Sequence, residues 1–198
     1  MIDLAKSVFL VDGSTEIRAL KKKFTSSYGL SPNLRKVGCN GKDVSPEGYA
    51  NAAHATLILV LRSCFTSIIC ILDREKRRQS AARFASQIRQ AVINKLLTSS
   101  KYRQEELDAK IRVCVPDRMF ENWIVSDIEG IKNNVELIDQ SATQQHYDGT
   151  SGATILKRIM KTNYRKTIHG PKLFYSARFE ISKDNSPSFQ VFFNIIGS

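Results

Sequence analysis

The chain has 198 residues, 42% of them hydrophobic, which suits one folded domain with a modest extension and argues against a disordered chain. Thirty Lys and Arg against nineteen Asp and Glu give a formal net charge of +11. This excess indicates a polyanionic partner, either nucleic acid or an anionic membrane surface, or else serves solubility alone. The longest apolar run, residues 67–72, is too short to span a bilayer, so we expect no membrane association. Four scattered cysteines and three isolated histidines predict a reduced, cytoplasmic protein without a zinc site.

Strand-like and helix-like segments alternate along the first two thirds of the chain. Short apolar runs predict strands at residues 7–11, 35–39, 66–72 and 111–115. Helical spacing and start signals predict helices at residues 14–24, 47–63, 80–97 and 119–128. We then expect a polar loop over 132–152, a basic helix over 153–163, a turn at His169 and Gly170, and a helical tail with an aromatic cluster. The alternation predicts an α/β domain with a mainly parallel sheet, flanked by helices.

Acidic residues follow three of the predicted strands. They are Asp12 with Glu16, Asp73 with Glu75, and Glu121 with Asp127 a little beyond. Because the carboxyl ends of parallel strands share one edge of a sheet, these acids can meet there. Converging carboxylates repel one another unless a cation neutralises them, and all-oxygen ligands select Mg²⁺ or Mn²⁺. The plain alternative is that each acid caps a helix or faces water.

Spacing adds detail to this expectation. Asp12 and Glu16 flank a turn into a helix, and an extended chain would send Asp73 and Glu75 to the same side. Glu121 is equally well explained as a metal ligand or as a helix-start residue paired with a nearby base. We expect Asp127 to cap a helix or form an ion pair, and Trp123 to lie in the core rather than stack on a base.

Basic residues are concentrated beside the second acidic pair and near the end of the chain. The residues that we expect to contact nucleic acid phosphates are Arg74, Lys76, Arg77, Arg78, Arg158, Lys161 and Lys166. A solvated surface is the alternative, and it is the better explanation for the lysines at 21–23.

The ordered motifs resemble those of Toprim-like proteins. The segment VFLVDGSTE resembles the opening motif of Toprim domains, and IICILDREK resembles their apolar strand followed by D-x-D. MFENWIVSD is similar to a segment of RloB-like, Toprim-related defence proteins, and GATILKRIMKTNYRKTIHGP and SPSFQVFFNII resemble their carboxyl-terminal helices. Two positions depart from the pattern, because Asp12 stands where the family usually has Glu and Glu75 replaces the second Asp of D-x-D.

The resemblance implies a Toprim-like, Rossmann-like domain over residues 1–130, with a basic extension over 131–198 packed on it. It also implies Mg²⁺ (or Mn²⁺) binding, nuclease activity in defence against phages or plasmids, and a partner ATPase. On this hypothesis the metal ligands are Asp12, Glu16, Asp73, Glu75 and Glu121, and Lys157 is the lysine that stabilises the transition state. The alternative is a non-catalytic nucleic-acid-binding or adaptor subunit that supports the ATPase. A small-molecule Mg²⁺ enzyme is a third, weaker reading, since the sequence has no P-loop or dinucleotide fingerprint.

Overall fold

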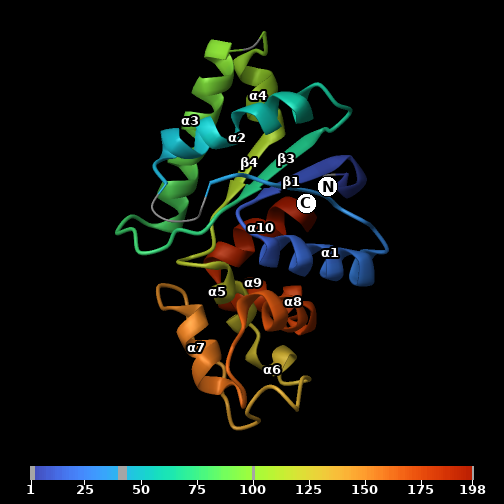
Figure 1. Ribbon diagram of the computed structural model, residues 1–198, viewed down its shortest axis with the longest axis vertical. Helices are drawn as coiled ribbons and strands as arrows, with labels where there is room; N and C mark the ends of the chain where they lie inside the picture. The colour runs from blue at the N-terminus through green and yellow to red at the C-terminus, as the bar shows by residue number, and fades with distance from the viewer. Residues whose placement is uncertain (1–2, 40–43, 100, 198) are drawn as a thin grey trace.

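The computed structural model describes residues 3–39, 44–99 and 101–197 and shows an α/β fold built on a four-stranded, all-parallel sheet (Figure 1). The strand order is β2-β1-β3-β4. The strands are β1 (Ser7–Val11), β2 (Asn33–Lys36), β3 (Ser67–Ile71) and β4 (Ile111–Cys114). The predicted α/β class with a parallel sheet is therefore confirmed, although β2 spans Asn33–Lys36 and not the expected residues 35–39.

Ten α-helices are described, preceded by a short 3-10 turn (Leu4–Lys6). They are α1 (Ser14–Tyr28), α2 (Pro46–Leu61), α3 (Ala81–Ser99), α4 (Gln104–Lys110), α5 (Phe120–Val125), α6 (Ile128–Ile131), α7 (Gly152–Ile159), α8 (Lys166–Ser176), α9 (Phe179–Asn185) and α10 (Pro187–Gly197). Helix α4 was not predicted. The helix expected over 119–128 is split into two, because the Asp127 carboxylate caps α6 at the Gly130 amide (2.9 Å).

Helices cover both faces of the sheet, which explains the near-continuous apolar strands. One face packs against α2 and α3, through Val8, Leu10, Ile68, Cys70, Tyr49, Leu57, Phe84, Ile88 and Val92. The other face packs against α1 and the carboxyl-terminal helices, through Phe9, Val11, Ile69, Ile71, Leu20, Phe24, Phe174, Phe189 and Phe192. In Figure 1 the α2–α3 layer lies above the sheet, and α1 and α10 lie below it.

The carboxyl-terminal segment belongs to the same core as the sheet. Trp123 is fully buried, with its ring centroid 4.9 Å from that of Phe192 and 5.4 Å from that of Phe189. The expected core role of Trp123 is confirmed. The proposed boundary at residue 130 falls inside α6, and apolar residues from both sides of it form one cluster.

The turn expected at His169 and Gly170 is wrong, because both residues lie inside α8. Gly170 serves close packing instead. A Cβ atom at this position would lie 2.9 Å from Thr15 Cγ2 and 3.2 Å from the Tyr164 hydroxyl. Glycine therefore lets α8 approach α1, against which it packs.

Candidate functional site at the carboxyl edge of the sheet

Strands β1, β3 and β4 end in register, which brings the segments that follow them to one edge of the sheet. Val11 of β1 is paired with Ile71 of β3, and Ile71 is paired with Cys114 of β4. Asp12 comes directly after β1, and Asp73 follows shortly after β3. The chain beyond β4 leads to α5, whose first turn carries Glu121. Parallel pairing therefore gathers acids that are far apart in the sequence.

Three of these acids surround one ammonium group. Lys166 Nζ lies 3.5 Å from Glu16 Oε1, 3.6 Å from Glu121 Oε2 and 3.9 Å from Asp73 Oδ2. The side chains of Glu16 and Glu121 are only 5% and 2% exposed. Acids from three separate segments thus meet at this edge, as expected, and the cation among them is a lysine. We call Glu16, Asp73, Glu121 and Lys166 the edge cluster.

The two buried glutamates differ in how their oxygens are satisfied. Glu121 Oε1 accepts a 3.0 Å hydrogen bond from the Tyr164 hydroxyl, while Oε2 faces Lys166. Glu16 Oε2 is buried and has no hydrogen-bond partner among the described residues. The Glu16 carboxylate folds back over Gly13, where a Cβ atom would lie 2.5 Å from Oε2. Glycine at residue 13 leaves the space that this carboxylate occupies.

Burial and like charge set the electrostatics of the edge cluster. Burial raises the pKa of Asp73 well above its ordinary value, and the neighbouring carboxylates of Glu16 and Glu121 add to this, while Lys166 opposes it. For Lys166, burial lowers the pKa, but Asp73, Glu121 and Glu16 outweigh burial and raise it above the ordinary lysine value. Burial also raises the pKa of Tyr164, with Glu121 acting in the same direction. The ammonium is therefore held charged and Tyr164 stays a hydrogen-bond donor.

The other two predicted ligands lie beside the edge cluster. Asp12 Oδ1 accepts a 2.8 Å hydrogen bond from Cys39 Sγ, and burial, with help from Glu16, raises the pKa of Asp12. Glu75 has a left-handed backbone (φ 57°), and its amide donates to the Arg118 carbonyl at 2.6 Å. The expected extended alternation of Asp73 and Glu75 is therefore wrong, because this long-range bond turns the chain. Glu75 still raises the pKa of Asp73 by its charge.

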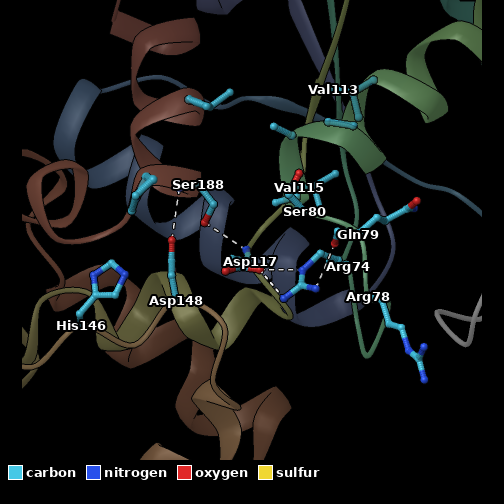
Figure 2. A pocket seen from close by; sticks show the side chains of 15 residues that line it. Arg74, Arg78, Gln79, Ser80, Val113, Val115, Asp117, His146, Asp148 and Ser188 are labelled. Carbon is cyan, nitrogen blue, oxygen red and sulfur yellow. Dashed lines mark hydrogen bonds and ion pairs between the residues drawn. The ribbon is translucent and has the colours of Figure 1, made fainter.

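The basic residues next to Asp73 divide into two kinds. Arg74 is turned into a cavity of about 610 Å³ between α3 and α10, where its guanidinium pairs with Asp117 at 2.5 Å (Figure 2). Arg77 donates to the carbonyl oxygens of Arg74 and Val44. These two arginines hold the loop in place. Lys76 and Arg78 are exposed, so they remain available to an anionic partner.

The lysine at the site is not the one that the sequence favoured. Lys157 and Arg158 are exposed in the last turn of α7, and Lys161 Nζ donates to the Val135 carbonyl at 2.8 Å. Sequence reasoning placed Lys166 among phosphate contacts and assigned no role to Tyr164. The only signal was their spacing as Tyr-x-Lys, which places Tyr164 just before α8 and Lys166 at its first residue.

The edge cluster has the donor chemistry of a hard-cation site but not its spacing. Its ligands are carboxylate oxygens, and Glu16 Oε2 is an unused buried acceptor, which fits Mg²⁺ or Mn²⁺. Among the described residues, however, no group of three or more His, Cys, Asp and Glu side chains is arranged to hold a metal directly. The Lys166 ammonium lies 3.5–3.9 Å from the carboxylate oxygens, whereas a bound Mg²⁺ would need those oxygens at about 2.1 Å. The residue types therefore fit the metal, whereas the spacing of the oxygens around Lys166 does not.

Fold and site together define an α/β protein with a parallel, Rossmann-like sheet and an acidic cluster at its carboxyl edge. Comparison with protein families, curated proteins and solved structures gives no match for this chain. Within the described residues no helix has the length and apolar character needed to cross a membrane.

Proposed function

We propose that this chain is a Mg²⁺-dependent (or Mn²⁺-dependent) nuclease of Toprim type that cleaves nucleic acid phosphodiesters, with defence against phages or plasmids as its setting. The convergence of Glu16, Asp73 and Glu121 on one cation carries the proposal. Buried carboxylates this close together are costly without a counter-charge. The net charge of +11 adds a reason for a polyanionic substrate.

Each residue of the edge has a role in this proposal. Glu16, Asp73 and Glu121 would hold the metal. Asp12 and Glu75, which interact electrostatically with the cluster, would share it or order water beside it. When bound, the metal ion would activate water and neutralise phosphate charge. Tyr164 would keep the Glu121 carboxylate oriented through its 3.0 Å hydrogen bond.

A lysine near the reacting phosphate would stabilise the charge that develops there. Lys166 meets this requirement by position, because its Nζ reaches the acids from the start of α8 and its side chain is 44% exposed. Lys157 lacks such a contact among the described ion pairs and hydrogen bonds, so we transfer the proposed role from Lys157 to Lys166. Exposed Arg78, beside Arg83, would guide the nucleic acid backbone toward the site.

The test is cleavage of DNA and RNA by Asp73→Asn in the presence of Mg²⁺ or Mn²⁺. This change keeps the side-chain shape but removes a charged ligand, and we expect cleavage to fall by ~100-fold or more. Glu105→Gln is the matched control, because Glu105 is exposed on α4. This helix leads into the amino end of β4, whereas the edge cluster lies beyond the carboxyl ends of the strands. Circular dichroism checks that both variants fold. Undiminished cleavage by Asp73→Asn would defeat the assignment.

A second candidate is a non-catalytic nucleic-acid-binding or adaptor subunit that works with an ATPase. The ion pairs of Lys166 favour it, since a lysine already provides a counter-charge to the three acids without any metal. Titration calorimetry with Mn²⁺ separates the two candidates. Specific binding that Asp73→Asn abolishes supports the nuclease, and the absence of binding supports the adaptor.

A further inference from the structure

Lys166 is held in the edge cluster loosely. Its three Nζ–oxygen distances, 3.5–3.9 Å, exceed the 2.7–2.9 Å of short charge-assisted hydrogen bonds. The ammonium therefore acts as a shared counter-ion and not as a tightly bonded partner of one acid. At the same time Glu16 Oε2 remains buried without a hydrogen-bond partner in the described part of the chain. The cluster has acceptor capacity that the lysine leaves unused.

The Lys166 side chain can leave without any movement of the backbone. It is the first residue of α8 and is 44% exposed, on a flexible four-carbon stem. The rest of α8 is fixed by the buried side chains of Leu173 and Phe174 and by the close approach of Gly170 to Thr15. The Lys166 ammonium can therefore change position while the backbone of α8 stays in place.

We propose that Lys166 is a built-in counter-ion that competes with a divalent metal for Glu16, Asp73 and Glu121, and that metal binding displaces its ammonium from the edge cluster. The inference rests on the proposed function, because it concerns how the same site is loaded. In the metal-free protein the lysine supplies the counter-charge that these three buried acids share. Metal enters only when its concentration suffices to displace the ammonium, so the lysine sets the concentration at which the site is filled.

The experiment measures Mn²⁺ affinity by titration calorimetry at mildly alkaline pH, where protons compete less for the carboxylates. Lys166→Met removes the competing charge and keeps an unbranched chain, so we expect binding to tighten by ~10-fold or more, within the usual range of coupling between two ligands. Lys166→Arg keeps the charge and should leave affinity close to wild type. Lys172→Met is the matched control: Lys172 lies on the same helix, is 45% exposed and pairs with Glu136 away from the cluster.

Each possible result either supports or overturns the competition between Lys166 and the metal. Equal or weaker Mn²⁺ binding by Lys166→Met overturns the competition while leaving the metal site in place. Absence of binding in wild type and in every variant overturns both the competition and the proposed function. If Lys166→Met unfolds without metal, its thermal unfolding is followed as Mn²⁺ is added. Recovery of the fold supports displacement, whereas failure of both Lys166→Met and Lys166→Gln to recover overturns it.

Discussion

The Tyr164 hydroxyl donates a 3.0 Å hydrogen bond to Glu121 Oε1, and this bond joins the chain just before α8 to the first turn of α5. Tyr164→Phe removes the donor and leaves a buried carboxylate oxygen without it. We expect a loss of ~1.5–3 kcal/mol in the free energy of unfolding, measured by urea denaturation. Tyr175→Phe is the control, since Tyr175 is partly exposed and its loss should cost less than ~0.5 kcal/mol. Equal stability of the two variants would contradict the role given to this bond.

Gly13→Ala tests whether the position of the Glu16 carboxylate depends on the space that glycine leaves at residue 13. The new Cβ atom would lie 2.5 Å from Glu16 Oε2, and the backbone at residue 13 is extended, so the flexible carboxylate must move. We expect the unfolding free energy to change by less than ~1 kcal/mol. Mn²⁺ binding, measured by calorimetry, should weaken because a ligand has been displaced. Gly38→Ala is the control, since a Cβ atom there would have no atom within 4 Å. Unchanged binding by Gly13→Ala would argue against Glu16 as a ligand.

The hydrogen bonds of Asp127 predict how the stability of the protein changes as the pH falls. Burial raises the pKa of Asp127, but hydrogen bonds from Arg178 and from the Gly130 amide outweigh burial and leave the pKa below its ordinary value. The unfolded pKa is about 3.9, so the stabilising contribution is complete above that pH and is lost as pH falls through the lower folded value.

Asp127→Asn removes this titration. We expect it to cost ~1–3 kcal/mol at neutral pH and to make the loss of stability below pH ~4 shallower, as followed by urea denaturation across pH. Glu180→Gln changes an exposed acid on α9 and should keep the wild-type profile. Parallel acid profiles for wild type and Asp127→Asn would rule out the proposed linkage.

Arg78 tests the nucleic acid contact. It is exposed and lines a groove with Arg77, Gln79 and Arg83. Arg78→Ala should weaken non-specific binding of DNA or RNA and reduce the slope of log affinity against log salt by about 1, measured by fluorescence anisotropy. Arg103→Ala, at the start of α4, should change neither quantity. The contact is refuted if Arg78→Ala keeps the wild-type salt slope.

Local sequence patterns determined much of the fold. Apolar runs of strand length, separated by helical spacing, specified a parallel α/β sheet, because strands buried on both faces need apolar residues at nearly every position. Similar local reasoning identified Trp123 as a core residue, which is confirmed. It also predicted that Asp127 caps a helix or forms an ion pair, and the structure shows Asp127 doing both. It also indicated that acids after separate strands would meet, since parallel strands end at a common edge.

Only the tertiary structure decided which cation stands among those acids. Lys157 and Lys166 are chemically alike and both belong to the basic carboxyl-terminal segment, so composition and periodicity did not choose between them. The packing of α8 against α1, through Gly170 and Thr15, places Lys166 at the sheet edge. Likewise, the bond from the Glu75 amide to the Arg118 carbonyl turns a chain that local pattern predicted to be extended. Periodicity is a property of neighbouring residues and is readable in sequence, whereas the position of a charge depends on contacts between distant segments, which form only when the chain folds.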